Sequence, residues 1–509
     1  MNDVFAIDFG TTNSIVSLVG RPTGSDDYLP RLYLQNGKPH PSVVSYSGSK
    51  PVVGQDALDQ LRDLRLGVIG DIVRSPKMFL GGQQSIYLSG MTKTPVEVVR
   101  DVLSFLRVDA LSYGGEDNSF SRAIITIPVT MDGRARAELR EAARMAGITI
   151  HQFVHEPLSA IYGYLRQLPN YQKAMANLDR SPIVVFDWGG GTLDLTLCEM
   201  QDGVLTQILN SGTKDVGGDA FDKRLRQLAL RKHSETGANA DWVLLTPSSQ
   251  ARVLQECADA KIRLSSREAT TLFVDDLVDS AGNHSTLDVR ISRSEYEAQV
   301  QDLVTAGLHT LDNLLEQAGI NPGILQWCIA TGGMVGMPAI QRGLQNRFSV
   351  DQLPPIEKPA DLIAQGAAWI AHDDVMLRLA KPLEVVVAPR YYATLIPKGE
   401  ILPRGGSSNP RHFDMYCVDP SDGFAKFQFC RPTRPGREQA GDARTPYAIA
   451  TLPVDPKARP LLERLHVNVD INENLLAKVS IYSKRSKLCC KVDIPDLEFG
   501  IDVAGGRGD

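Results

Sequence analysis

The sequence contains no uninterrupted apolar stretch near the length of about 20 residues that is needed to cross a membrane. Its N-terminus, MNDVFAIDFG, has no basic segment followed by an apolar run and so does not resemble a secretion signal. The formal net charge of −6 gives no general attraction to nucleic acids or to anionic lipids. We therefore expect a cytoplasmic protein that acts on neither membranes nor nucleic acids.

Cysteine is also sparse and scattered. The chain has 7 cysteines, an odd number, and no two of them form a C-x-x-C pair. This excludes the usual spacing patterns of zinc sites and disulfide frameworks and fits a reducing compartment. The motif G-x-x-x-x-G-K-[ST] is absent as well, so the chain is not a P-loop protein.

A chain of 509 residues is too long for one core and predicts two to four folding units. Up to residue 374 the pattern alternates between strands and helices, which predicts an α/β domain. Residues 3–19 predict a hairpin whose turn is Gly-Thr-Thr-Asn, and the other predicted strands and helices of this part lie at 123–127, 132–147, 156–166, 183–187, 193–199, 218–232, 248–264, 293–318, 327–331 and 359–371. Asp132 and Ser292 are typical residues for beginning a helix, and Gly147 and Gly319 for ending one.

The character changes after this part. Residues 375–382 are predicted to be a linker, and 383–500 hold short β-type runs that predict an all-β, sandwich-like domain. Within it, the Pro-, Arg- and Gly-rich interval 431–460 predicts a long loop. Residues 501–509 are expected to form a flexible tail.

The first hairpin has a tip with the sequence DFGTTNS, beginning at Asp8. Gly10 allows the backbone to approach a phosphate closely, and Thr11, Thr12 and Asn13 add hydroxyl and amide groups. Asp8 leaves an apolar strand at a place where a carboxylate can hold hydrated Mg²⁺. Taken alone, this tip fits a plain polar turn equally well.

A second tip, DWGGGTLD, begins at Asp187 and repeats the arrangement of strand, aspartate, glycines and threonine. Gly189, Gly190 and Gly191 are poor strand residues, and contact with phosphate accounts for them. Two opposed tips can hold one triphosphate from both sides. The pair therefore predicts a protein that binds ATP or ADP with Mg²⁺.

These motifs belong to a longer series of matching segments. IDFGTTNS, VVFDWGGGTLDL, HEPLSAIYGYL, ATGGMVGMP and LIAQGAAWIA occur in the order and spacing of the actin-like ATPase superfamily. DIVRSPKMFLG, AIITIPVTMDGRAR, KDVGGDAFDKRL and DAKIRLSS resemble the DnaK-type seventy-kilodalton heat-shock chaperones in particular. ATLIPKGEILP and VNVDINENLLAKVSIYS are similar to the peptide-binding β-sandwich of that family. The resemblance implies an actin-like, two-lobed ATPase domain followed by a small β-sandwich.

The resemblance also implies roles for single residues in a slow, Mg²⁺-dependent ATPase. Asp8 and Asp187 match the carboxylates that hold Mg²⁺ through water, and Lys77 matches the lysine beside the γ-phosphate and the attacking water. Glu156 matches the carboxylate that orders the metal-bound water, and Thr192 the hydroxyl near the γ-phosphate. Without the resemblance, Lys77 would be a surface lysine and Glu156 an ordinary carboxylate at a helix start.

The implied nucleotide contacts extend beyond these catalytic positions, with Lys261 and Ser265 at the adenosine. The full set is Gly10, Thr11, Thr12, Asn13, Gly189, Gly190, Gly191, Asp194, Gly217, Gly218, Lys261, Ser265, Gly332 and Gly333. Pro128 and Arg136 match residues that relay the nucleotide state to the second domain.

Several positions depart from the family pattern. Ala258 and Gly336 stand where the family has a glutamate and an arginine beside the base, which predicts weaker nucleotide binding. Gln152 and His155 replace an arginine and an asparagine on the face that a J-domain co-chaperone contacts; the expected role of His155 is structural. In the linker, Arg378 interrupts the apolar run and the usual aspartate is missing, so standard J-domain stimulation is in doubt.

The resemblance leaves two functions open. One is an ATP-dependent chaperone whose β-domain binds extended polypeptide or one dedicated protein partner. For this function, Tyr391 and Tyr392 either form a peptide-contacting rim or pack against the sandwich core. Because the residues after Gly500 are too few for a helical lid, peptide exchange should be fast. The alternative is a nucleotide-gated regulatory or assembly scaffold without general chaperone activity.

Overall fold

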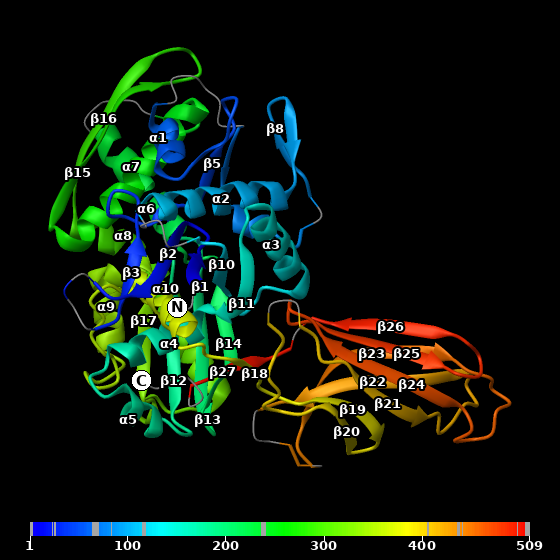
Figure 1. Cartoon of the computed structure of the whole chain (residues 1–509). Coiled ribbons are helices and arrows are strands. Elements are labelled where there is room, and N and C mark those ends of the chain that lie inside the picture. The colour runs from blue at the N-terminus through cyan, green and yellow to red at the C-terminus, as the bar shows by residue number, and fades with distance from the viewer. Residues whose placement is uncertain are drawn as a thin grey trace.

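The computed structural model describes residues 4–22, 24, 27–63, 71–82, 84–113, 119–235, 241–404, 407–434, 438–439, 441–495 and 497–503. Two α/β lobes, each with its own six-stranded sheet, contain the part up to residue 374, and an all-β domain projects to one side (Figure 1). Two strands of the second sheet, Leu377–Leu379 and Phe499–Asp502, come from later in the chain. No helix in the described ranges is long and apolar enough to cross a membrane.

The first lobe is built on a mixed sheet in which β1 pairs in parallel with β10 and antiparallel with β2. The strand order is β11-β10-β1-β2-β3, with β4 paired to β2. The strands are β1 (Val4–Phe9), β2 (Asn13–Gly20), β3 (Leu29–Tyr33), β4 (His40–Pro41), β10 (Arg122–Ile127) and β11 (Thr149–His155). The helices around it are α2 (Pro95–Tyr113), α3 (Gly133–Met145), α4 (Glu156–Gln167), α5 (Tyr171–Ala176) and α10 (Leu362–His372).

A smaller subdomain extends from the first lobe. It consists of β5 (Val43–Ser45), β6 (Val52–Val53), α1 (Gln55–Asp63), β7 (Ile72–Arg74), a 3-10 turn at Pro76–Phe79, β8 (Ile86–Leu88) and β9 (Met91–Lys93). The short turn carries Lys77 and follows Ser75, whose φ is 53°.

The second lobe has the strand order β17-β12-β13-β14-β27-β18. Its strands are β12 (Pro182–Trp188), β13 (Leu193–Gln201), β14 (Val204–Thr213), β17 (Trp327–Thr331), β18 (Leu377–Leu379) and β27 (Phe499–Asp502). Its helices are α6 (Gly218–Glu235), α7 (Pro247–Ser266), α8 (Arg293–Ala318) and α9 (Pro338–Gln345). The sequence predicted β12, β13, β17 and the three longest of these helices within a few residues.

The helix boundaries follow the predicted capping chemistry. The Asp132 side chain accepts a hydrogen bond from the backbone N–H of Ala135 at the start of α3. At the start of α8, Ser292 and Glu295 form a complete capping box, and Gly319 closes the helix with φ 67°. These contacts satisfy backbone groups that a helix end leaves without intrahelical partners.

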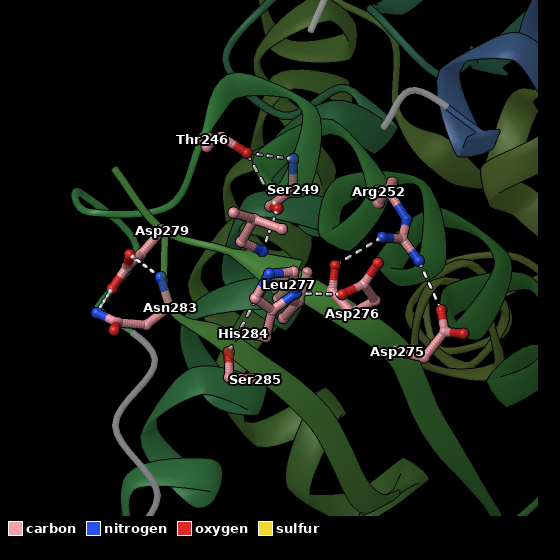
Figure 2. Close-up of polar contacts among 11 residues, drawn as sticks. Thr246, Ser249, Arg252, Asp275, Asp276, Leu277, Asp279, Asn283, His284 and Ser285 are labelled. Carbon is pink, nitrogen blue, oxygen red and sulfur yellow. Dashed lines mark hydrogen bonds and ion pairs between the residues drawn. The ribbon is translucent and has the colours of Figure 1, made fainter. Parts of the chain in front are cut away.

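The outer end of the second lobe is the hairpin of β15 (Ala269–Val278) and β16 (His284–Ser292), which has a register shift between Val274 and Leu277. Figure 2 shows the polar contacts around this bulge, where Arg252 of α7 reaches Asp275 at 2.6 Å and the backbone oxygen of Asp276 at 3.1 Å. His284 pairs with the Asp276 carboxylate at 2.5 Å. These contacts compensate for ladder hydrogen bonds that the bulge interrupts.

The all-β domain is a sandwich of two four-stranded sheets, ordered β20-β19-β22-β23 and β21-β24-β25-β26. Its strands are β19 (Leu383–Ala388), β20 (Tyr391–Ile396), β21 (Arg411–Tyr416), β22 (Phe424–Pro432), β23 (Arg444–Pro453), β24 (Arg464–Ile471), β25 (Ala477–Ser483) and β26 (Cys489–Ile494). The predicted loop over 431–460 is therefore wrong for 444–453, which form a ten-residue strand paired with β22.

The two ends of the all-β domain also differ from the expectation. Leu377–Leu379 of the predicted linker form β18, and Leu377 and Leu379 are buried. The predicted tail is wrong for Ile501 and Asp502, which belong to β27 between β14 and β18. The strand forms because Ile501 and its neighbours bury apolar side chains on the second lobe. The remainder of the predicted tail, 504–509, lies outside the described residues.

Candidate functional site

The two glycine-rich tips meet between the lobes. The first joins β1 to β2 and the second joins β12 to β13. A Cβ atom on Gly190 would lie 2.7 Å from Thr12 Oγ1, and one on Gly10 would lie 2.2 Å from the backbone oxygen of Asn13. Only glycine fits at these two positions, because the tips approach each other and fold back on themselves.

The second tip rests on the start of α6. The N–H of Asp219 donates to the Gly190 oxygen at 2.7 Å, and that of Gly218 to the Gly189 oxygen at 3.2 Å. A Cβ on Gly217 would lie 2.3 Å from the carbonyl carbon of Gly191. The predicted pair Gly217 and Gly218 thus supports the second tip directly.

Lys261 reaches the same region from α7. Its ammonium group lies 2.8 Å from Asp222 Oδ1 and donates to the Gly218 oxygen at 3.1 Å. Ser265, one turn further along α7, donates to the Lys261 oxygen at 3.3 Å. The predicted adenosine contacts are therefore neighbours on one helix beside the second tip.

The aspartates of the tips are half-buried and electrostatically coupled. Asp8 accepts a hydrogen bond from Thr126 Oγ1 at 2.6 Å, while burial and the charge of Glu156 raise the pKa of its carboxyl group to about 6. Burial, followed by Glu156 and Asp194, also raises the pKa of Asp187 well above its usual value. Partial burial and neighbouring carboxylates therefore disfavour the ionised forms of both aspartates.

Thr192 and Asp194 stand together at the end of the second tip. The Thr192 hydroxyl donates to Asp194 Oδ2 at 2.5 Å. Burial is the main cause that raises the pKa of the Asp194 carboxyl group, with the Thr192 bond acting against it. Both predicted residues thus face the same carboxylate cluster.

Lys77 supplies a cation to this cluster and is buried, unlike an ordinary surface lysine. Its Nζ donates to Glu156 Oε1 at 2.7 Å, which joins the 3-10 turn of the small subdomain to the first residue of α4. The charge of Lys77 also lowers the pKa values of Asp8, Asp187 and Asp194, against the larger effect of burial. One lysine thus faces four carboxylates.

This donor set fits hydrated Mg²⁺. Among the described residues, no three His, Cys, Asp or Glu side chains lie close enough to one another to hold a metal ion directly. Asp8 and Asp187 nevertheless present half-buried carboxylates at the junction of the tips, and Mg²⁺ commonly retains several waters beside one or two carboxylates. When bound, the ion would neutralise charge on the phosphates and on these carboxylates.

Gly332 and Gly333 lie behind the second tip. Thr331 at the end of β17 pairs with Asp187 of β12. The glycine pair that follows Thr331 therefore lies next to the second tip. Gly332 has φ 89°, and a Cβ there would lie 2.5 Å from Asp187 Oδ1. Gly336 ends the short 3-10 turn that follows.

Two polar partners of the site were missed in the sequence. Thr126 bonds Asp8 from β10, and Asp222 of α6 bonds Lys261. The available signal for Thr126 was a hydroxyl residue inside the apolar run AIITI. Asp222 gave no comparable signal, because a charged residue on a helix is ordinarily exposed.

Of the two positions predicted to relay the nucleotide state to the second domain, Arg136 contacts that domain, and the role of Pro128 stays a prediction. Arg136 donates to the backbone oxygens of Asn474, Leu475 and Pro495 at 2.8, 3.3 and 2.6 Å. Gln152 is buried and donates to the Val375 oxygen at 3.1 Å.

Comparison with known proteins agrees with this arrangement. A model of the family described as Hsp70 protein matches residues 77–376, more than half of the chain. The chaperone protein DnaK of Thermosipho melanesiensis is 29% identical over 376 residues, covering 72% of this chain and 58% of that protein. The chaperone protein DnaK of Thermotoga neapolitana is 29% identical over 373 residues with the same two coverages. The chain thus spans less than two thirds of the length of these relatives. The chain belongs to the Hsp70 family.

Proposed function

We propose that the protein binds Mg-ATP between its lobes and hydrolyses it slowly to ADP and phosphate. The single observation that carries this proposal is the meeting of two glycine-rich tips at a half-buried group of carboxylates with Lys77 and Glu156 at its edge. Several carboxylates that share one lysine and are partly removed from water are costly to a fold and indicate a site that receives a further cation.

The proposed division of labour follows from the contacts. The tip glycines leave room for phosphate oxygens, and their backbone N–H groups are the donors for those oxygens. Lys77 places positive charge beside the transferred phosphoryl group, and Glu156 holds Lys77 and orients water. Because phosphoryl transfer to water requires positioning and charge stabilisation more than covalent chemistry, these few side chains suffice.

We further propose that nucleotide turnover serves polypeptide binding by the all-β domain. Apolar side chains are exposed where its strands β19, β20 and β22 meet loops: Val387, Tyr391 and Phe424 are 51%, 67% and 45% exposed. Tyr391 is thus available to a peptide. Tyr392 instead lies under the Arg444 guanidinium and lines a cavity of about 350 Å³.

The second candidate, a nucleotide-gated scaffold for one folded partner, is favoured by a different observation. The all-β domain of this chain is attached to the ATPase lobes at both ends, through β18 and β27. Gln152, at the position expected to contact a J-domain, is buried against the linker and is not available to a partner.

Two measurements separate these functions. Isothermal titration with Mg-ATP and a phosphate-release assay test the ATPase, and the absence of both binding and release would reject it. Fluorescence anisotropy with a labelled Leu-rich peptide, in ADP and in ATP, tests the chaperone function. We expect nucleotide-dependent, fast-exchanging binding with a Kd on the order of micromolar or weaker. No binding in either state, together with capture of one folded partner, would favour the scaffold.

A further inference from the structure

The strand β27 returns the chain from the all-β domain to the second lobe, and no family resemblance predicted it. Val204 and Leu205 of β14 pair with Asp502 and Ile501 on one side of it. On its other side β27 pairs with β18, in a register that joins Leu377 to Ile501 and Leu379 to Phe499. Among the described strands of this sheet, β18 pairs only with β27, so β27 connects the linker to the lobe.

The fit of β27 is close and specific. A Cβ on Gly500 would lie 2.4 Å from the Leu205 oxygen, so the strand packs directly against β14. Asp502 bonds the Arg378 guanidinium at 2.6 Å, and its N–H donates to the Met376 oxygen at 2.9 Å. The residue that interrupts the apolar linker, Arg378, therefore has a carboxylate partner on β27.

Phe499 links this strand to the catalytic region. Its buried ring faces the His155 imidazole with 3.9 Å between ring centroids. On its other edge, His155 Nδ1 is hydrogen-bonded to the Gln207 amide nitrogen of β14. The His155 side chain is thus held between two strands of the second lobe, although it belongs to β11 of the first.

His155 is also the residue immediately before α4. It has extended backbone geometry, with φ −69° and ψ 135°, and the next residue is Glu156, whose carboxylate binds Lys77 at 2.7 Å. A shift of the imidazole would move the first turn of α4, and with it the Glu156–Lys77 pair. A displacement of about 1 Å at a reacting group is enough to lower turnover about a hundredfold.

We propose that β27 is a positioning strand, in which Phe499 sets His155 and hence Glu156 for ATP turnover while its pairing holds β18 on the second lobe. Phe499 touches no predicted nucleotide contact and is a positioning residue. The catalytic half of this inference rests on the proposed ATPase function; the half that concerns β18 does not.

The test uses the full chain with three variants. Phe499→Ala removes the ring, Phe499→Leu keeps most of the apolar volume, and Phe273→Ala removes a 56% exposed ring on β15 as the control. Turnover, the Kd for ATP and hydrogen exchange at 155–157 and 377–379 are measured for each. Phe499→Ala should lower kcat about ten- to hundredfold and leave the Kd within about threefold of wild type, because only positioning changes. Exchange should become faster in both segments, Phe499→Leu should recover most of the turnover, and Phe273→Ala should match wild type.

A folded Phe499→Ala protein with wild-type kcat overturns the positioning role, and unchanged exchange at 377–379 overturns the role in holding β18. If Phe499→Ala does not fold, Asp502→Asn tests the role in holding β18, since it removes the negative charge that pairs with Arg378; faster exchange at 377–379 supports that role and unchanged exchange overturns it. A wild-type protein that does not hydrolyse ATP would reject the proposed ATPase, and exchange at 377–379 would still decide whether β27 holds β18.

Discussion

At the scale of single residues, burial and neighbouring charges set the properties of Lys77 and of the tip aspartates. A lysine on a short turn is ordinarily exposed, yet Lys77 is buried with its ammonium group 2.7 Å from Glu156. Asp8 and Asp187 end ordinary apolar strands, but their burial makes their ionised forms unfavourable until a cation is bound.

Replacing Lys77 with alanine should remove most ATP turnover and leave ATP binding nearly intact. In the proposed reaction the lysine stabilises charge on the phosphoryl group during transfer, so its loss should cost about 10²–10³-fold in kcat, as for other preorganised charge donors. Single-turnover phosphate release and equilibrium binding measure the two effects separately. Lys50→Ala, at an exposed loop lysine, is the matched control. Wild-type turnover in Lys77→Ala would show that the catalytic assignment is wrong.

Replacing Asp8 with asparagine should stabilise the protein in the absence of metal and nucleotide. The pKa of Asp8 is raised from 3.8 to about 6, so the folded chain binds this proton more tightly than the unfolded chain. Protonation of Asp8 contributes its full share to the free energy of unfolding below pH about 4. This contribution falls as the pH rises through 6 and is absent above it, which lowers the free energy of unfolding by up to about 3 kcal/mol. At pH 7.5 Asp8→Asn should therefore unfold at higher denaturant concentration than wild type, and the difference should shrink at pH 5.

The same variant should lose the stabilisation that Mg-ATP gives to the wild type, because Asn carries no charge to hold the hydrated ion. Thermal unfolding with and without Mg-ATP measures this loss, and Asp351→Asn, at an exposed aspartate, serves as the control. A Mg-ATP shift of wild-type size in Asp8→Asn would contradict the metal assignment.

At the scale of elements, the helix pair α4 and α10 fixes where Glu156 stands. The two helices approach through glycine: a Cβ on Gly366 would lie 1.8 Å from the Ser159 oxygen, and one on Gly163 would lie 2.7 Å from the Leu362 oxygen. Such spacing lets the helix backbones pack directly against each other and against the first-lobe sheet.

Gly366→Ala should destabilise the protein by about 3 kcal/mol or more, because the added methyl group meets backbone that cannot move aside. Chemical denaturation monitored by tryptophan fluorescence measures the change. Gly20→Ala is the control, since a Cβ at Gly20 would have no described atom within 4 Å and the backbone there is not left-handed. Equal stability of the two variants would mean that the helix pair separates without cost.

Elements with local signals were predictable from the sequence, and those defined by distant partners were not. The caps at Asp132 and Ser292 and the two glycine-rich hairpins have their signals within a few residues. The ten-residue β23 was missed because its neighbourhood is rich in Pro and Arg, and it exists through pairing with β22. The strand β27 is four residues long and depends on β14, about three hundred residues earlier, which no local pattern reveals.

The residues of the candidate site also differ in whether a local sequence signal or a distant partner defines them. Glycines that must lie close to other atoms, such as Gly10 and Gly190, can be predicted from the sequence because they occur in short glycine-rich motifs. The ion pair between Lys77 and Glu156 joins two subdomains that are far apart in the sequence, so only the family resemblance predicted that both residues belong to one site. Thr126 and Asp222 were missed because their roles are set by what packs against them.

At the scale of the whole molecule, the two α/β lobes and the all-β domain form one connected structure (Figure 1). A single hydrophobic cluster extends from the first-lobe sheet through Leu377, Leu379 and Phe499 into the sandwich. The chain enters the all-β domain through β18 and leaves it through β27, so the domain is held at two neighbouring strands. The predicted linker 375–382 is therefore part of this connected structure, and the two domains separate only if the contacts between them are broken.

Replacing Arg136 with alanine should open the contact between the first lobe and the all-β domain. This side chain, on α3 of the first lobe, donates to three backbone oxygens of the all-β domain, and each buried oxygen left without a partner costs about 1–3 kcal/mol. Undocking would expose the linker, so trypsin should cleave after Arg378, which the wild type protects within β18. Arg134→Ala on the same helix is the matched control, because Arg134 is largely exposed and forms only a surface pair with Glu138. If trypsin cleaves the two variants at the same rate, the Arg136 contacts do not hold the domains together, and the remaining contacts, such as those of Arg140 with Asn474 and Glu473 and the pairing of β27, keep the linker in place.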